Sequence, residues 1–252
     1  MLNEERRQKI TEILTQRKRV LVKEISSDFN ISEVTIRKDL EILEKRGVLS
    51  RVHGGAILKE HRVTDLALTE KERIHPKEKQ RMAQKAVEII EPGDAIILDS
   101  GTSTTQIARE IKFKKDIKVI TNAINIAAEL AASENEVILT GGFLREQSFS
   151  LVGPFAEDTL RHMNADKLFL GVDGIHFKYG LTTPNLLEAR VNQLMIEIAS
   201  EVILVADSSK FGKRSMGVIS QISAIDKIIT DKKIQRDDFN RLNDLGIQII
   251  LA

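Results

Sequence analysis

From Lys77 onward, short runs of β-branched and other apolar residues recur along the chain, with helical patterns between many of them. The apolar runs are AIILD, KVITN, EVILT, KLFLG, EVILVAD, DKIIT and IQIILA. The amphipathic segments that separate them include KEKQRMAQKAVEII, INIAAELAA and NLLEARVNQLMIEIA. Alternating strands and helices predict a mostly parallel sheet with helices on both faces. We therefore expect an α/β fold for residues 77–252.

The first 58 residues have a different pattern, which predicts three short helices followed by a hairpin. The first helix carries an apolar stripe formed by Ile10, Ile13 and Leu14. A second helix is expected over roughly residues 22–29. Ser32 is a good N-cap for a third helix, from Glu33 to about Arg46, which Gly47 would end. Two helices joined by a short turn are what a helix-turn-helix motif requires.

The segment between these regions, residues 59–76, is polar and weakly periodic. We interpret it as a linker with some helix. The expected organisation is therefore a helix-turn-helix domain over residues 1–58, a linker over 59–76 and an α/β domain over 77–252.

Composition narrows the class of protein. Hydrophobic residues make up 42% of the 252 residues, which supports a real core. The absence of cysteine excludes disulfides, thiol catalysis and cysteine-ligated zinc, and fits a reducing cytoplasm. The charged N-terminus lacks an apolar signal-peptide region, and no apolar stretch approaches the ~20 residues that span a bilayer. We expect a cytoplasmic protein that does not bind a membrane.

The excess of positive charge near the N-terminus is compatible with nucleic-acid binding there but is too small to indicate it by itself. Residues 1–58 hold twelve Lys and Arg against nine Asp and Glu, whereas the remainder holds twenty-six against twenty-eight. On the third helix, Ile36, Leu40 and Leu43 share an inward face, and the opposite face is polar. Such a helix enters a major groove in DNA-binding proteins, although a solvated charged face is the simpler interpretation.

The residues after this helix favour DNA binding. The stretch VLSRVHGGAIL predicts a strand, a Gly-Gly turn and a second strand, which form a wing. Arg51 and His53 are two residues apart, so they are expected to share one strand face and reach phosphates. A structural hydrogen bond is the alternative role for His53. The candidate DNA-binding residues are Ser32, Thr35, Arg37, Lys38, Arg51 and His53.

The stretch ISEVTIRKDLEILEKRGVLSRVHGGA resembles the N-terminal signature of the DeoR family of bacterial transcription regulators. The segments LTGGFLREQSFSLVGP, FLGVDGI, GLTTPNLLEARVN and VADSSKFGKRS resemble the members that regulate N-acetylgalactosamine use. The resemblance implies a winged helix-turn-helix followed by a sugar-phosphate-sensing domain. It also implies a repressor of a sugar or amino-sugar operon that a phosphorylated sugar, such as a galactosamine or tagatose phosphate, releases from its operator.

Polar residues gather where the predicted strands end, which is where open α/β sheets bind ligands. The stretch DSGTSTT, residues 99–105, leads from a strand into a helix whose N-terminus can hold an anion. The lysine of a nucleotide-binding P-loop is missing. Asp99 would repel a close phosphate, so its carboxylate is expected to accept a sugar hydroxyl. Helix capping is the alternative role of these hydroxyl side chains.

Four further strand ends and their flanking loops supply candidates, of which Thr121-Asn122 and Gly141-Gly142 are weak by themselves, because such residues form turns more often than ligand sites. These pieces resemble the superfamily of ribose-phosphate isomerase and glucosamine-phosphate deaminase. The resemblance implies that GTSTT holds the phosphate, that GVDG presents acidic groups and that ADSSK supplies a lysine. It also implies that Glu188 occupies a place comparable to that of the catalytic base, although the loop GLTTPNLLEA differs from the glycine-rich segment that carries the base in ribose-phosphate isomerases. The candidate effector-binding residues are Asp99, Ser100, Gly101, Thr102, Ser103, Thr104, Thr121, Asn122, Gly141, Gly142, Arg145, Asp173, Gly174, Thr183, Glu188 and Lys210.

Three functions remain open on this basis. The favoured one is a non-enzymatic repressor, at least a homodimer because two-fold operators pair with protein dimers. A sugar-phosphate isomerase or deaminase with an appended DNA-binding domain is the second, and an architectural DNA binder is the third. The five histidines show no paired metal-ligand spacing. We expect no metal and no cofactor.

Overall fold

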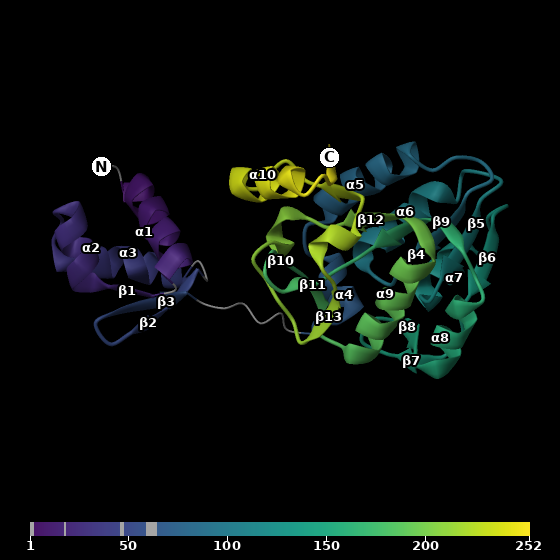
Figure 1. Cartoon of the computed structure of the whole chain (residues 1–252), viewed down its shortest axis with the longest axis horizontal. Coiled ribbons are helices and arrows are strands. Elements are labelled where there is room, and N and C mark those ends of the chain that lie inside the picture. The colour runs from purple at the N-terminus through teal and green to yellow at the C-terminus, as the bar shows by residue number, and fades with distance from the viewer. Residues whose placement is uncertain (1–2, 18, 46–47, 59–64) are drawn as a thin grey trace. The chain divides into compact units, whose positions relative to one another are not determined.

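The computed structural model describes residues 3–17, 19–45, 48–58 and 65–252, and these form two compact units (Figure 1). The first unit is Met1–His61 and the second is Arg62–Ala252. Within the described residues, no helix is both long enough and apolar enough to cross a membrane.

The first unit packs three helices against a small antiparallel sheet. Its elements are α1 (Asn3–Arg17), β1 (Arg19–Leu21), α2 (Val22–Phe29), α3 (Glu33–Lys45), β2 (Leu49–Val52) and β3 (Gly55–Leu58). The predicted apolar faces meet in one core, in which Ile10, Leu14, Ile36, Leu40 and Leu43 are buried. The expected helix end at Arg46 and Gly47 lies outside the described residues, as do residues 59–64 of the expected linker.

The wing differs from the sequence prediction in two respects. The turn is His53-Gly54, and Gly55 already belongs to β3. Strand β1, which was not predicted, pairs with β3, and a Cβ on Gly55 would lie 2.1 Å from the carbonyl oxygen of Val20. Gly55 is therefore needed for close approach of two strands. The expectation that Arg51 and His53 share a strand face is wrong, because His53 lies in the turn.

The second unit is built on a fully parallel seven-stranded sheet in the order β15-β14-β12-β9-β4-β5-β6. The strands are β4 (Ala95–Leu98), β5 (Lys118–Thr121), β6 (Glu136–Leu139), β9 (Ala165–Leu170), β12 (Ala199–Val205), β14 (Lys227–Thr230) and β15 (Gln248–Leu251). The chain adds strands outward from β4 to β6, then returns to β9 on the other side of β4 and continues to β15. Strands β4 and β9 thus flank the point where the winding direction changes.

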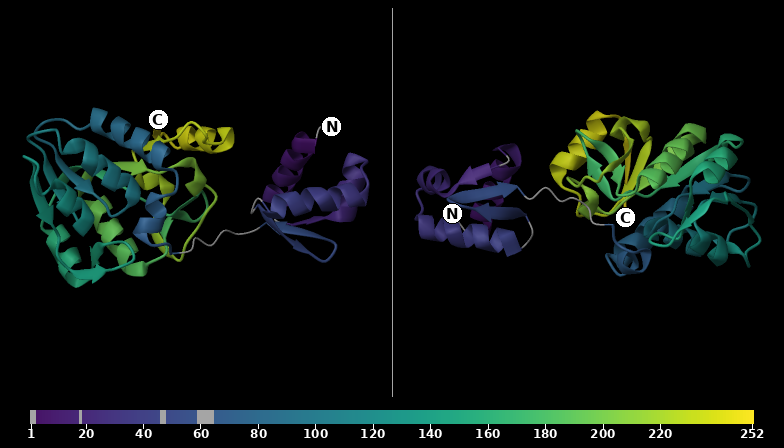
Figure 2. Two further views of the ribbon diagram at one scale, coloured as in Figure 1. Left: turned by 180° about the vertical axis from the view of Figure 1, so that it is seen from behind. Right: turned by 90° about the horizontal axis from the view of Figure 1, so that it is seen from below.

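Helices cover both faces of this sheet, as the alternation of strands and helices predicted (Figure 2). On one face lie α5 (Pro76–Glu88), α6 (Thr102–Ile111) and α7 (Ile124–Leu130), whose buried residues share one apolar cluster. On the other lie α8 (Pro154–Arg161), α9 (Leu186–Ile198) and α10 (Arg236–Asp244), which share a second. Strands that are buried on both faces of a sheet have continuous apolar sequences, which is why the apolar runs predicted these strands.

Two small antiparallel sheets and a short helix complete the second unit. One sheet joins β10 (Gly174–His176), β11 (Gly180–Thr183) and β13 (Gly217–Ser220), and the other joins β7 (Phe143–Arg145) and β8 (Ser150–Val152). Helix α4 (Leu68–Glu72) lies within the segment expected to be a linker. Two short 3₁₀ turns occupy Ser208–Lys210 and Ile222–Ala224.

Candidate effector pocket and DNA interface

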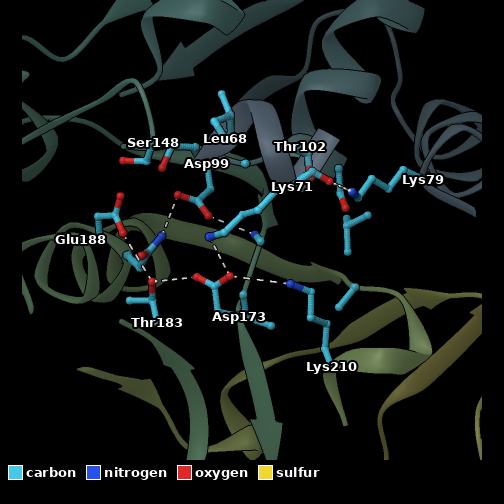
Figure 3. A pocket seen from close by; sticks show the side chains of 18 of the residues that line it. Leu68, Lys71, Lys79, Asp99, Thr102, Ser148, Asp173, Thr183, Glu188 and Lys210 are labelled. Carbon is cyan, nitrogen blue, oxygen red and sulfur yellow. Dashed lines mark hydrogen bonds and ion pairs between the residues drawn. The ribbon is translucent and has the colours of Figure 1, made fainter. Parts of the chain in front are cut away.

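A pocket opens at the carboxyl ends of β4, β9 and β12, three neighbouring strands of the large sheet (Figure 3). Ligands of open α/β sheets bind where the winding direction changes, and β4 and β9 flank that point here. The cavity volume is about 60 Å³. Its lining includes the loops after all three strands, from which Asp99, Asp173 and Lys210 come. The sequence prediction of a site at strand ends is thus matched by a pocket.

The N-terminus of α6 forms one wall of the pocket. Ser100, Gly101, Thr102 and Ser103 line it, at the end of the helix where backbone N–H groups lack partners within the helix. Thr104 lies outside the lining, because its hydroxyl donates to the carbonyl oxygen of Gly101 at 2.9 Å and its side chain is buried. The first turn of α6 therefore offers hydrogen-bond donors and a positive dipole end to an anion.

Asp99 is buried beneath the pocket and is fully engaged by donors. Asn192 Nδ2 donates to one oxygen at 2.7 Å, and the backbone N–H of Gly171 donates to the other at 3.0 Å. Burial raises the pKa of Asp99 to about 7, against the effect of these hydrogen bonds, and the charge of Glu188 adds to the rise. Near neutral pH this carboxyl therefore takes up and releases a proton.

Asp173 lies between two lysines. Its Oδ1 atom is 2.8 Å from Lys71 Nζ and 3.6 Å from Lys210 Nζ, and Thr183 Oγ1 donates to Oδ2 at 3.1 Å. Burial by itself would raise the pKa of Asp173, but the charges of Lys71 and Lys210 and the hydrogen bonds from Lys71 and Thr183 lower it. Asp173 is therefore an ionised acceptor in the pocket.

Glu188 comes from the first turn of α9, where Asn185 caps the helix by accepting from the N–H of Leu187 and of Glu188. Its Oε1 atom accepts from Ser150 Oγ at 3.0 Å and from Arg145 Nη1 at 3.1 Å. Arg145 lies behind Glu188 rather than in the lining, and its other Nη atom pairs with Asp65. The positive charge of Arg145, predicted to meet an anionic ligand, is thus engaged by two carboxylates.

Besides Thr104 and Arg145, five further predicted residues lie outside the lining of the pocket. Thr121 is buried and donates to the carbonyl oxygen of Leu98 at 2.7 Å, and Asn122 donates to that of Leu151 at 3.3 Å. Gly142 and Gly174 lie against backbone, where a Cβ would approach a carbonyl oxygen to 2.8 and 2.6 Å respectively. Gly141 adopts a positive φ of 73° in the loop after β6. These positions serve turns and packing, which is the alternative that their sequence pattern left open.

Sequence reasoning missed two lysines that line the pocket, Lys71 from α4 and Lys79 from α5. Lys79 is only 4% exposed, and burial lowers its pKa to about 8, with the charges of Lys210 and Lys71 also lowering it and those of Asp207 and Glu72 raising it. The signal for Lys79 was its spacing, because it shares one helix face with Met82, Ala83 and Ala86. A lysine on an apolar face is costly unless it is partnered.

The other missed lining residues include Asn192, Gln147 and Ser148. Asn192 follows Glu188 by four positions on the buried face of α9, so the helical period connects the two side chains. Gln147 and Ser148 belong to the loop between β7 and β8, a hairpin that the apolar pattern did not predict. Their position was not readable from the sequence.

In the first unit, the predicted recognition helix begins as expected. Ser32 caps α3, since its hydroxyl accepts from the N–H of Thr35 at 3.3 Å and lies 2.9 Å from the Thr35 hydroxyl. Arg37 and Lys38 are exposed one turn later, and Arg37 Nη2 lies 2.5 Å from Glu33 Oε2. The first two turns of α3 thus present both hydroxyls and cations to solvent.

The wing and the helix are joined by an ion pair in which Arg51 Nε lies 2.7 Å from Glu44 Oε2. His53 is exposed in the turn of the wing. Behind the recognition helix, Asp39 is buried and accepts from Arg6 Nε at 2.6 Å and from Arg7 Nε at 2.9 Å. This cluster fixes α3 to α1, so the outward face of α3 is held by the core of the unit.

Comparison with protein families assigns both units. Residues 6–62 match the DeoR-like helix-turn-helix domain, and residues 74–232 match the DeoR C-terminal sensor domain. Among solved structures, a D-ribose-5-phosphate isomerase in complex with phospho-erythronic acid is 15% identical, with 54% of each chain covered and a TM-score of 0.41.

Curated relatives align with almost the whole chain. A putative aga operon transcriptional repressor of Escherichia coli O157:H7 is 40% identical, with 98% of this chain and 93% of that protein covered. The HTH-type transcriptional regulator GlpR of Haloferax volcanii is 38% identical, with 99% of this chain and 98% of that protein covered. The lactose phosphotransferase system repressor of Streptococcus mutans is 34% identical, with 94% of this chain and 95% of that protein covered. The chain therefore belongs to the DeoR family, and it is a DNA-binding transcriptional regulator with a C-terminal sensor domain.

Proposed function

We propose that this regulator represses a sugar or amino-sugar catabolic operon and that a phosphorylated sugar, bound in the pocket of the second unit, releases it from its operator. The observation that carries the proposal is the division of the pocket into two chemical ends. The N-terminus of α6 offers backbone donors, whereas Asp173 and Glu188 offer carboxylates.

The α6 end suits a phosphate. Four residues of the turn, Ser100–Ser103, line the cavity, and the helix dipole favours an anion there. Lys79 and Lys210 also line the pocket and supply positive charge. A phosphate bound near these groups would make charge-assisted hydrogen bonds, which are the stronger class of hydrogen bond in proteins.

The acid end suits the hydroxyl or amino groups of a sugar. Asp173 is ionised and therefore accepts hydrogen bonds from polar groups, as its Oδ1 does from the ammonium of Lys71. Thr183 bridges Asp173 and Glu188, because its hydroxyl lies 3.1 Å from one carboxylate and 3.4 Å from the other. The two acids therefore form one acceptor surface. The similarity to repressors of the aga operon and of a lactose transport system supports a sugar as the ligand.

A sugar-phosphate isomerase or deaminase is the second candidate, and the pKa of Asp99 near 7 favours it, since proton transfer is fastest when the pKa lies near the working pH. Against it, both oxygens of Asp99 are occupied by Asn192 and Gly171. Glu188 is held by Ser150 and Arg145. We infer that the pocket binds its ligand without converting it.

The proposal is tested with an operator fragment that the wild-type protein selects from random-sequence DNA. Gel shifts with galactosamine 6-phosphate or tagatose 6-phosphate should show weaker operator binding, whereas the free sugars and inorganic phosphate should have little effect. A ligand at 100 times its Kd should also stabilise the protein by ~2.7 kcal/mol. Unchanged operator affinity across a broad panel of sugar phosphates would overturn the sensor function. Turnover of such a ligand that Glu188→Gln abolishes would favour the enzyme.

We also propose that the protein binds its operator as a homodimer or larger homo-oligomer, because helix-turn-helix proteins read two half-sites with two copies of the recognition helix. Analytical ultracentrifugation of the full chain with and without the operator fragment tests this. A monomer that binds a single half-site would contradict it.

A further inference from the structure

Helix α4 is the first described helix of the second unit, and the chain enters it from the DNA-binding unit through residues 59–67. Polar contacts hold its N-terminal end. The N–H of Leu68 donates to the carbonyl oxygen of Gln147 at 2.8 Å, and Gln147 Nε2 donates to that of Asp65 at 3.2 Å. Asp65 also pairs with Arg145, which in turn holds Glu188. The entry to α4 is therefore tied to an acid of the pocket.

The C-terminal end of α4 is tied to the pocket by two lysines. Lys71 Nζ lies 2.8 Å from Asp173 Oδ1, so the last turn of α4 pairs with the second acid (Figure 3). The buried Lys79 donates to the carbonyl oxygens of Lys71 and Ile74, each at 2.5 Å. Both lysines line the cavity. A ligand there meets the groups that keep α4 in place.

Apolar packing of α4 is slight. Leu68 is the buried residue of this five-residue helix, at 5% exposure. A second cavity of about 460 Å³ lies against Leu68, Thr69 and Glu72, so α4 borders an open space on one side and the effector pocket on the other. Elements with few buried apolar contacts open at low free energy. Helix α4 is therefore held mainly by polar contacts, and it has open space beside it.

The acid end of the effector pocket is already occupied by a side chain of α4. The ammonium of Lys71 occupies the side of Asp173 that faces the cavity. A sugar group that binds Asp173 must take the place of this ammonium.

We propose that α4 couples the two functions of the chain: a sugar phosphate that binds Asp173 breaks its ion pair with Lys71, α4 undocks, and operator affinity falls. This inference rests on the proposed function of the pocket and adds the element that transmits its occupancy. Residues 59–67 join the DNA-binding unit to α4 in the sequence, so we place the coupling at α4.

The proposal is tested by substitutions that remove the contacts of α4 in the absence of a ligand. In Lys71→Met, operator affinity measured by fluorescence anisotropy should fall by about 5- to 150-fold, the usual range of allosteric coupling. Amides of residues 65–72 should exchange with deuterium several-fold faster than in wild type. Asp65→Asn removes the ion pair with Arg145 at the N-terminal end of α4 without altering a residue that lines the pocket, and it should act in the same direction. Lys85→Met, which removes an exposed lysine paired with Glu88, is the matched control and should change neither quantity.

Circular dichroism and gel filtration check that each variant is folded, and the two variants at different ends of α4 guard against misfolding in one. Wild-type operator affinity and wild-type exchange in both variants would overturn the role of α4, even if galactosamine 6-phosphate or tagatose 6-phosphate releases the wild type from DNA. Failure of every sugar phosphate to release the wild type would instead overturn the proposed function. The two failures are therefore distinguishable.

Discussion

Asn192 Nδ2 donates to Asp99 Oδ1 at 2.7 Å, and this contact joins α9 to the loop after β4 at the base of the effector pocket. The pair explains why a buried carboxyl is tolerated there: its hydrogen-bond acceptors are satisfied by Asn192 and by Gly171. Burial nevertheless raises the pKa of Asp99 from 3.8 to about 7. The protein therefore carries an acid that is more easily ionised when the chain is unfolded.

This difference predicts a pH dependence of stability. The folded state binds the proton of Asp99 more tightly, so the stability that this proton supports is present below pH 4 and is lost as the pH rises towards about 7. Wild type should lose on the order of 4 kcal/mol relative to Asp99→Asn across that range. Urea unfolding of both proteins between pH 4 and 8 measures it. The exposed Asp158→Asn is the control, and a pH-independent difference between wild type and Asp99→Asn would contradict the prediction.

The buried cluster behind the recognition helix predicts a large loss of stability on substitution. Asp39→Ala removes the buried carboxylate that Arg6 and Arg7 share and leaves Arg7 only Glu4, and breaking a buried pair typically costs about 3–5 kcal/mol. Hydrogen exchange of amides in α1 and α3 of the full chain should report this loss in the first unit, with the second unit unaffected.

Glu41→Ala removes an exposed partner of Lys45 on the same helix and serves as the comparison. Equal effects of Asp39→Ala and Glu41→Ala on exchange would show that burial of the cluster contributes nothing.

The exposed cations of α3 predict two distinguishable effects on operator binding. Arg37→Ala should cost about 1–3 kcal/mol and relax the preference for one base, if its guanidinium reads a guanine. Lys38→Ala should weaken all sequences alike and reduce the salt slope of binding by about 1, as loss of a phosphate contact does. Binding to the selected operator and to single-base variants at several salt concentrations measures both. If both variants bind the operator with wild-type affinity and wild-type salt dependence, Arg37 and Lys38 of α3 do not contact the DNA.

Lys210 predicts an effect on ligand affinity that is separate from DNA binding. It lines the pocket 3.6 Å from Asp173, and loss of a charge-assisted hydrogen bond typically costs about 1.5–3 kcal/mol. Lys210→Met should therefore bind a releasing sugar phosphate at least tenfold more weakly, by isothermal titration calorimetry. Lys85→Met is again the control, and unchanged affinity in Lys210→Met would place Lys210 outside the binding set.

Local patterns were enough to predict the strands of the large sheet, most of the long helices and the general place of the site. The apolar runs marked the strands of the large sheet because those strands are buried on both faces. Ser32 marked a helix start, because a side-chain oxygen at that position accepts a backbone N–H group. The polar turn after AIIL marked one wall of the pocket, since strand ends meet at one edge of a parallel sheet.

Short antiparallel strands such as β1 could not be predicted from local patterns. Strand β1, three residues long, pairs with β3 across a separation of more than thirty positions. Such a strand has too few residues to show a period of its own. Strand β1 forms because the fold places β3 beside it.

The sequence by itself determined the family, the alternation of strands and helices, and the turns whose chemistry is local. Tertiary structure decided which polar residues meet. It placed Lys71 and Lys79 beside the acids and turned Arg145 towards Asp65 and Glu188. It also kept Thr121 and Asn122 for internal hydrogen bonds. The physical reason is that a side chain's hydrogen bonds and charge partners come from segments far away in the chain, and no local period records which segments those are.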